Sequence, residues 1–217
     1  VNYIGTLNML KIALNSRAKF LFASSSEVYG FSSRYPLSEN DWGDVNPNGI
    51  RGCYREGKRN AESLCLDYFR KLNLDIKIVR IFNTYGPYMR FDDERVVSNF
   101  ICSCLQNRDI NIYGDGNQTR SFCYVDDLIN GLIKLMNTNI NGPINLGNPT
   151  EITIIELAKI ISKKLNISEK FVFKELPQDD PLQRNPIIAE AQDKLNWSPS
   201  LDLEQGLENT INYFKNL

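Results

Sequence analysis

Histidine is absent from the 217 residues of this chain. Its absence excludes a Ser-His-Asp triad, a Cys-His nucleophile pair and every zinc site that takes a histidine ligand. Any proton transfer must therefore use tyrosine, lysine, carboxylate groups or water.

Cysteine is scarce and follows no metal-binding or redox spacing. The chain has 5 cysteines and no C-x-x-C pair, and they are Cys53, Cys65, Cys102, Cys104 and Cys123. An odd set of this kind favours reduced thiols in a reducing compartment. We therefore expect a cytoplasmic protein without a bound metal.

Strong net charge and long apolar runs are also absent. A formal net charge of −1 provides no electrostatic footprint for nucleic acid or for an anionic membrane. No apolar run approaches the roughly 20 residues that span a bilayer.

The chain begins at Val1, inside a helical pattern and without an initiator methionine. We expect a segment of a longer protein, and a membrane anchor upstream that holds the parent protein in a secretory compartment is the alternative to a cytoplasmic location.

The phosphate-binding loop of dinucleotide folds, G-x-G-x-x-G, is missing as well. Residues 114–119 come near it, but they lack the third glycine and follow no long buried strand. We interpret them as a tight turn.

What is present is an alternation of helix and strand patterns. We expect a helix over 1–16, a strand over 19–26, a helix over 54–72 and a strand over 75–83. This order is typical of a parallel sheet whose neighbouring strands are connected by helices. The sequence therefore predicts an α/β fold in which residues 1–91 form the later half of a Rossmann-like, doubly wound parallel sheet.

The pattern changes after residue 91. We expect helices over 94–108, 128–137, 153–165, 189–196 and 202–217, and strands over 110–113, 121–125, 143–147 and 170–176. Thr153 followed by Glu156 predicts a capping box at the start of one of these helices. The elements indicate a smaller C-terminal α/β substrate lobe over 92–217, from which segments around 121–137 return to the first domain.

Tyr54 and Lys58 are the first candidates for chemistry. They stand four residues apart at the start of a helical pattern, so both side chains lie on one face of the helix. A nearby ammonium group stabilises a phenolate, which would let Tyr54 exchange a proton with a substrate hydroxyl. Ser25, at the end of the strand over 19–26, would hydrogen-bond the same oxygen. Chance alone supplies Tyr and Lys at this spacing, so an ordinary pair on a helix surface is the alternative.

Five blocks of sequence occur in one order, over residues 24–58, 81–87, 95–100, 113–122 and 145–149. Together they resemble the UDP-glucuronate decarboxylase (UDP-xylose synthase) family of the extended short-chain dehydrogenases/reductases, which belong to the NAD-dependent epimerase/dehydratase superfamily. The resemblance covers essentially the whole chain and matches the C-terminal two-thirds of that family.

The resemblance implies an NAD-dependent lyase. NAD⁺ would oxidise C4′ of UDP-glucuronate while Tyr54 removes the hydroxyl proton and Lys58 holds the phenolate and the ribose. The resulting β-keto acid would lose CO₂, and its re-reduction would give UDP-xylose. The implied partners are NAD, a UDP-sugar and a second copy of the chain, with the helices over 1–16 and 54–72 as the dimer contact.

The resemblance also assigns roles around the catalytic pair. Ser25 matches the Ser/Thr partner of the tyrosine. Ser26 and Glu27 match a pair beside the sugar ring, with Glu27 as acid/base or gatekeeper. Related 4,6-dehydratases usually carry Asp where Ser26 stands, and a serine cannot serve as that acid at neutral pH. Ser24, and Asn2 near the nicotinamide end, are implied to bind the cofactor together with the catalytic pair.

Arg184 matches an arginine that faces the sugar carboxylate, which a guanidinium can hold with two parallel hydrogen bonds. Asn185 replaces the lysine that usually follows it. The other residues implied to bind the nucleotide sugar are Asn83, Arg95, Asn99, Tyr113, Gln118 and Arg120. A second departure is Arg55, where the family usually has Asp; we give it little weight because it should face away from the catalytic pair.

Several alternatives stay open. Glu27 would otherwise be a surface carboxylate, and Arg184 a solvated loop arginine. A nucleotide-sugar 4-epimerase or 4,6-dehydratase would use the same oxidation. The chain could also be a non-catalytic truncated fragment, because it lacks the G-x-G-x-x-G loop and should have lost most affinity for NAD.

Overall fold

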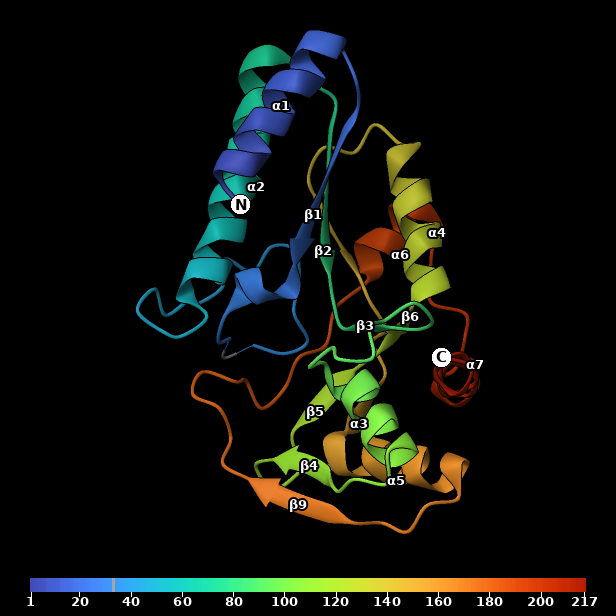
Figure 1. Ribbon diagram of the computed structural model, residues 1–217. Helices are drawn as coiled ribbons and strands as arrows, with labels where there is room; N and C mark the ends of the chain where they lie inside the picture. The colour runs from blue at the N-terminus through green and yellow to red at the C-terminus, as the bar shows by residue number, and fades with distance from the viewer. Residues whose placement is uncertain (33) are drawn as a thin grey trace.

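The computed structural model describes residues 1–32 and 34–217, which form two lobes (Figure 1). The first lobe contains α1 (Ile4–Ser16), β1 (Phe20–Ser25), the short 3₁₀ helix η1 (Ser26–Tyr29), α2 (Gly52–Leu72), β2 (Ile76–Ile81), α4 (Val125–Met136), β7 (Pro143–Leu146) and α6 (Ala189–Leu195). None of the helices in the described ranges is both long enough and apolar enough to cross a membrane.

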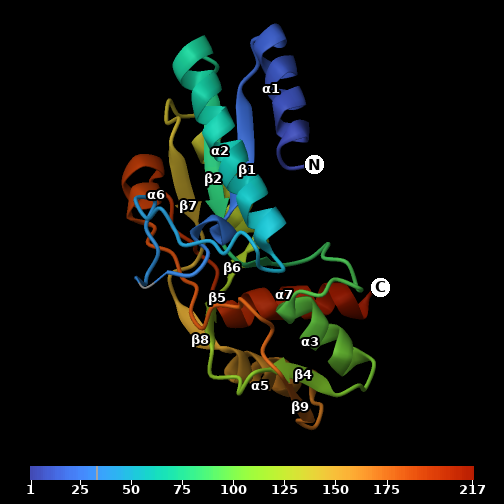
Figure 2. The same ribbon diagram turned by 90° about the vertical axis from the view of Figure 1, so that its left-hand side faces the viewer.

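The centre of the first lobe is a parallel sheet in the order β1-β2-β7. Figures 1 and 2 show α1 and α2 side by side on one face of this sheet and α4 and α6 on the other. Ile76 and Ile78 of β2 pack against the first helix pair, whereas Val79 and Ile81 pack against the second. Because the side chains of a strand alternate between faces, one strand supplies both cores. The predicted doubly wound α/β arrangement is confirmed.

The second lobe packs three helices against short strands. It contains β3 (Thr84–Tyr85), α3 (Val96–Leu105), β4 (Ile110–Tyr113), β5 (Thr119–Ser121), β6 (Cys123–Tyr124), β8 (Glu151–Thr153), α5 (Ile154–Leu165), β9 (Phe171–Lys174) and α7 (Leu203–Lys215). The predicted capping box is confirmed, since Thr153 and Glu156 exchange side-chain to backbone hydrogen bonds. The core of this lobe lies where α3, α5 and α7 meet.

One predicted strand is wrong. The strand expected over 121–125 is split, because β5 pairs antiparallel with β8 and β6 pairs parallel with β3. The strand β8 was not expected at all. Partners from distant parts of the chain decide these short pairings, and no local periodicity encodes them.

Several helix boundaries also differ from the prediction, and the starts of α3 and α4 have a clear reason. The helix expected from 94 begins at Val96, because Arg95 has an extended backbone. The helix expected from 128 begins at Val125, with Asp126 and Asp127 in its first turn, where carboxylates favour a helix N-terminus. In addition to α4, β7 and α6 also return to the sheet of the first lobe, although they lie beyond the segment around 121–137.

Candidate active site

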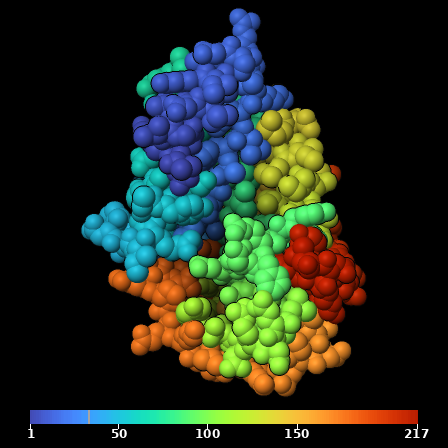
Figure 3. Space-filling view, viewed as in Figure 1, coloured from blue at the N-terminus to red at the C-terminus, as the bar shows by residue number. Residues whose placement is uncertain are grey.

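A cavity of about 970 Å³ opens at the carboxyl ends of β1 and β2. Parallel α/β sheets place ligands at this edge, where polar residues follow buried strands. Residues of both lobes line the cavity. In Figure 3 the blue and cyan surface of the first lobe adjoins the green and orange surface of the second across the middle of the molecule.

Tyr54 and Lys58 line this cavity from the first turns of α2. The Lys58 ammonium donates to the backbone carbonyl of Ala23 at 2.7 Å, and its Nζ lies 5.9 Å from the centre of the Tyr54 ring. Burial lowers the pKa of Lys58 below that of an exposed lysine, and Glu62 offsets part of this effect. Tyr54 and Lys58, predicted as a pair from their spacing in the sequence, therefore lie close together at the wall of a cavity.

The three serines at the end of β1 and the start of η1 all line the cavity, but Ser25 bonds differently from the prediction. Ser25 was expected to hydrogen-bond Tyr54. Instead its Oγ accepts a hydrogen bond from the Glu27 backbone N–H at 3.2 Å and caps η1, and no hydrogen bond joins it to Tyr54 in the part of the chain that the structure describes. Ser24 is buried and donates to the carboxylate of Glu62, and Ser26 is buried as well.

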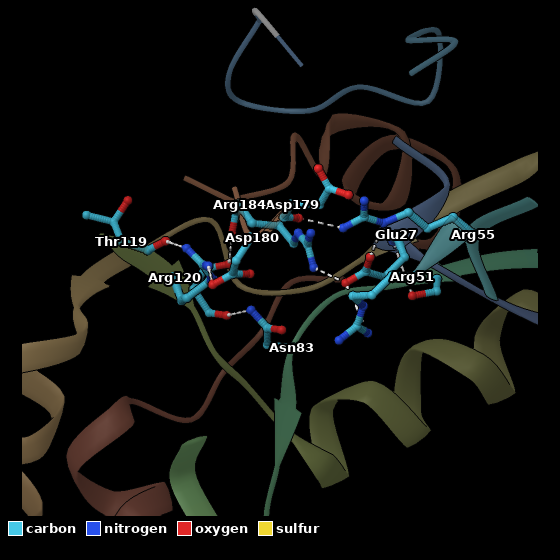
Figure 4. A network of polar contacts seen from close by, with 11 residues as sticks. Glu27, Arg51, Arg55, Asn83, Thr119, Arg120, Asp179, Asp180 and Arg184 are labelled. Carbon is cyan, nitrogen blue, oxygen red and sulfur yellow. Dashed lines mark hydrogen bonds and ion pairs between the residues drawn. The ribbon is translucent and has the colours of Figure 1, made fainter. Parts of the chain in front are cut away.

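Glu27 is surrounded by three guanidinium groups (Figure 4). Its Oε1 contacts Arg184 Nη1 at 2.5 Å and Arg51 Nη2 at 3.4 Å, and its Oε2 accepts from Arg55 Nε at 2.7 Å. Burial alone would raise the pKa of Glu27, but the charges of Arg184, Arg55 and Arg51 outweigh it and hold the pKa below its usual range. With 7% of its surface exposed, Glu27 is not a surface carboxylate, so that alternative is wrong.

Arg184 is not a solvated loop arginine either, because it is 7% exposed. It lies in the segment that follows β9 and lines the same cavity as Tyr54. Its Nη1 is held by Glu27, whereas its Nη2 is buried and has no hydrogen-bond partner among the described residues. A buried N–H group without a partner is costly, so this nitrogen is a ready donor to an anionic ligand.

The six residues expected on the nucleotide-sugar side also line the cavity, namely Asn83, Arg95, Asn99, Tyr113, Gln118 and Arg120. Arg120 is buried and pairs with Asp180 at 2.9 Å, and Arg95 is exposed at the rim near Asp93. The structure thus brings every expected site residue except Asn2 to one cavity. Asn2 lies instead against Gly57 of α2, where a Cβ on the glycine would stand 3.2 Å from the Asn2 Cβ.

Arg55 is the residue that the sequence analysis undervalued. It is completely buried, and it donates to Glu27 through Nε and to the backbone carbonyl of Asp179 through Nη2. Glu27 lies 28 positions away in the chain, and no spacing rule connects the two. The one available signal was the arginine itself, which departs from the pattern of the family that the sequence resembles.

Comparisons with known proteins agree with this arrangement. Residues 1–147 match the NAD dependent epimerase/dehydratase family. The chain is 48% identical over 215 residues to UDP-glucuronic acid decarboxylase 1 of Arabidopsis thaliana, covering 99% of the chain and 49% of the relative. It is 49% identical over 214 residues to UDP-glucuronic acid decarboxylase 1 of Xenopus tropicalis, covering 99% and 51%.

A solved structure is similar over nearly the whole chain. It is the UDP-glucuronic acid 4-epimerase from Bacillus cereus in complex with UDP-glucuronic acid and NAD. The TM-score is 0.90 at 30% identity, and the match covers 99% of this chain and 67% of that one. The chain spans about half the length of the curated relatives that it matches.

Proposed function

The chain belongs to the NAD dependent epimerase/dehydratase family, and we propose that its full-length protein decarboxylates UDP-glucuronate to UDP-xylose. The two decarboxylases that are 48% and 49% identical to it support this reaction. The observation that carries the proposal is that one cavity is lined by both Tyr54 and Arg184, and that the buried Nη2 of Arg184 has no hydrogen-bond partner among the described residues. The phenol of Tyr54 suits a sugar hydroxyl, and the guanidinium of Arg184 suits a carboxylate.

The basic residues of the cavity match the charges of a UDP-uronic acid. Arg184 is the donor for the sugar carboxylate, because a carboxylate would satisfy its buried Nη2 with a charge-assisted hydrogen bond. Arg120 and Arg95 line the part of the cavity formed by the second lobe, where they suit the diphosphate. The same cavity therefore offers separate cationic contacts for the two anionic ends of the substrate.

The catalytic pair performs the proton transfer. The Tyr54 phenolate, which the Lys58 ammonium stabilises, removes the proton of the C4′ hydroxyl, keeps it as a neutral phenol and later returns it. Oxidation at C4′ places a ketone β to the carboxylate. The bond from C5′ to the carboxylate then breaks, CO₂ leaves, and the electron pair passes into an enolate that is protonated at C5′. Reduction of the C4′ ketone completes UDP-xylose.

The described residues fit one end of an NAD molecule. A lysine ammonium has three donors, and Lys58 uses one of them on the carbonyl of Ala23, which leaves two for the hydroxyls of a ribose. Tyr54, Ser24 and Asn2 are the other groups that we propose on the cofactor side. Bound NAD supplies the reversible oxidation at C4′. The chain lacks the glycine-rich loop that holds the pyrophosphate in this fold.

The decisive experiment is a product assay on the full-length protein. Incubation with UDP-glucuronate and NAD is expected to release CO₂ and UDP-xylose, measured by trapping of labelled CO₂ and by chromatography. Turnover of dTDP-glucose or of UDP-galactose in place of UDP-glucuronate would contradict the proposal.

A second candidate is the 4-epimerase reaction on the same substrate. The specific observation in its favour is the similarity to the Bacillus cereus epimerase at a TM-score of 0.90. An epimerase would bind the carboxylate and keep it, so its product from UDP-glucuronate would be UDP-galacturonate without release of CO₂. The product assay separates the two reactions directly.

We also propose that two copies of the chain pair through α1 and α2. These helices lie side by side on one face of the sheet (Figure 2). Leu10 and Ala13 of α1 enter the core, whereas Ile4, Met9 and Ile12 of the same helix are exposed. A helix that is apolar on a second face is suited to a partner surface.

The substitution Ile12→Glu tests this surface. It is expected to convert a dimer of the full-length protein into a monomer, because a charged side chain would be buried without a partner in the interface. Sedimentation velocity reports the mass. Ile133→Glu is a matched control, since Ile133 of α4 is equally exposed, at 58%, on the opposite face of the sheet. A dimer that survives Ile12→Glu as well as it survives Ile133→Glu would exclude the α1 surface.

A further inference from the structure

Arg55 connects three parts of the chain that the site depends on. It begins on α2, one residue after Tyr54, and its guanidinium reaches the Glu27 carboxylate at 2.7 Å and the Asp179 carbonyl at 2.9 Å. Glu27 follows β1, and Asp179 belongs to the segment that also carries Arg184. Because Arg55 has no exposed surface, both contacts are made away from water.

Both oxygens of the Glu27 carboxylate are occupied by this arrangement. Oε2 is held by Arg55, and Oε1 is held by Arg184 and Arg51. A carboxylate in this setting stays ionised and has no proton to donate. It holds Arg184 through Nη1, which leaves the buried Nη2 without a hydrogen-bond partner among the described residues.

Three guanidinium groups against one carboxylate leave this wall of the cavity positively charged. The other nearby arginine, Arg120, is paired with Asp180. The excess charge beside Glu27 therefore belongs to Arg51, Arg55 and Arg184. An anionic group that enters the cavity would offset this excess charge. The arginines are already held in place before binding, so the site needs little rearrangement to receive the anion.

We propose that Arg55 is a positioning residue that holds Glu27 and the Asp179 backbone in place, so that Arg184 presents its free nitrogen to the carboxylate of the sugar. The identity of that ligand rests on the proposed function. Arg55 itself does not line the cavity, so it acts through Glu27 and through the segment of Arg184.

Ligand affinity gives the first test. In the full-length protein, Arg55→Met is expected to weaken UDP-glucuronate by about ten- to hundredfold, since misplacement of a binding group by about 1 Å has effects of this size. The affinity for UDP-glucose, which has no carboxylate, is expected to stay nearly unchanged. Arg55→Lys is expected to recover part of the loss. An ammonium keeps a positive charge beside Glu27, but it cannot reproduce the two-sided contact of the guanidinium with Glu27 and Asp179.

The matched control is Arg59→Met. Arg59 lies one turn further along α2, and its guanidinium donates to the backbone carbonyls of Val28 and Trp42 without contact to Glu27. Its loss removes an arginine from the same helix and is expected to leave the preference for UDP-glucuronate intact. Equal weakening of UDP-glucuronate and UDP-glucose by Arg55→Met would overturn the proposal.

The pH profile gives a readout that a merely structural role would not change. The charged groups that face Glu27 are Arg51 immediately before α2, Arg55 of α2 and Arg184 from the segment after β9. The ionised arrangement is intact at neutral pH and is lost as the pH falls through the lowered pKa of Glu27. Without Arg55 that pKa rises, so the acidic limb of UDP-glucuronate affinity moves to higher pH in Arg55→Met. If the acidic limb of UDP-glucuronate affinity lies at the same pH in Arg55→Met as in the wild type, the proposal is contradicted.

A double mutant tests whether Arg55 acts through Glu27. In a Glu27→Gln background, Arg55→Met is expected to cost much less affinity than in the wild type, because the contact that it would break has already lost its charge. Fully additive effects would place the action of Arg55 elsewhere and overturn the proposal.

Acid unfolding of the ligand-free protein separates this proposal from the proposed function. Followed by circular dichroism, the acid transition is expected at higher pH in Arg55→Met than in the wild type or in Arg59→Met. This shift tests the hold on Glu27 even if the wild type does not bind UDP-glucuronate, a result that would refute the proposed function alone. Should Arg55→Met fail to fold, Arg55→Lys is used instead, and its acid transition is expected to show a smaller upward shift, because the lysine keeps the positive charge but loses the guanidinium geometry. An acid transition that is the same in all variants rejects the role of Arg55.

Discussion

Tyr54→Phe in the full-length protein is expected to lower kcat for UDP-glucuronate by about a thousandfold, within the range that general acid-base catalysis contributes. Tyr54 lines the cavity, and phenylalanine keeps its ring and removes only the hydroxyl. Lys58 keeps its contact to the Ala23 carbonyl, so the wall of the site is preserved. The loss should therefore appear in kcat, measured by release of CO₂, while the Kd for UDP-glucuronate changes little.

The control for this substitution is Tyr68→Phe. Tyr68 lies on the same helix and packs against the core between α1, α2 and the sheet, far along the helix from the catalytic pair. It loses the same hydroxyl, and activity is expected to stay near that of the wild type. If Tyr54→Phe kept activity within tenfold of the wild type, Tyr54 would not be the group that exchanges the C4′ proton.

Arg184→Ala is expected to weaken UDP-glucuronate by about 3 kcal/mol, roughly a hundredfold or more, because it removes one partner of a buried, charged contact. UDP-glucose carries no carboxylate for Arg184 to bind, so its affinity should fall far less. Calorimetric titration of both ligands measures the difference. The ratio of the two losses of affinity matters more than either loss alone. A general effect of the substitution on folding would weaken both ligands equally and would cancel in this ratio.

Arg120→Ala provides the comparison. Arg120 lines the same cavity, and we propose it for the diphosphate that both ligands share. Its removal is expected to weaken UDP-glucuronate and UDP-glucose alike. Should Arg184→Ala also weaken both by the same factor, Arg184 would have no role in recognition of the carboxylate, and the choice of a uronic acid as substrate would lose its main support.

Local patterns predicted much of the fold and, within the site, the catalytic pair. The helical spacing of Tyr54 and Lys58 places them together because residues four apart share a face of any α-helix. The capping box at Thr153 is local in the same way. The strands β1, β2 and β7 were predicted because buried parallel strands have continuous apolar sequence.

Local patterns could not predict how the short strands pair. The segment over 121–125 was expected to be one strand, yet Ser121 ends β5, Cys123 and Tyr124 form β6 with another partner, and Val125 begins α4. Ser25 was likewise expected to hydrogen-bond Tyr54, whereas it is the N-cap of η1. In both cases several arrangements were compatible with the residues, and packing selected one.

By itself the sequence determined which chemistry is available: without histidine, proton transfer falls to a tyrosine beside a lysine, and one helical turn is enough to bring them together. Only the tertiary structure decided what Glu27 and Arg184 do, because they are 157 positions apart and meet directly, beside Arg55, at the junction of a strand end, a helix and a C-terminal segment. The energy of a buried ion pair depends on distance and on exclusion of water. Both are properties of the folded chain that no spacing in the sequence expresses.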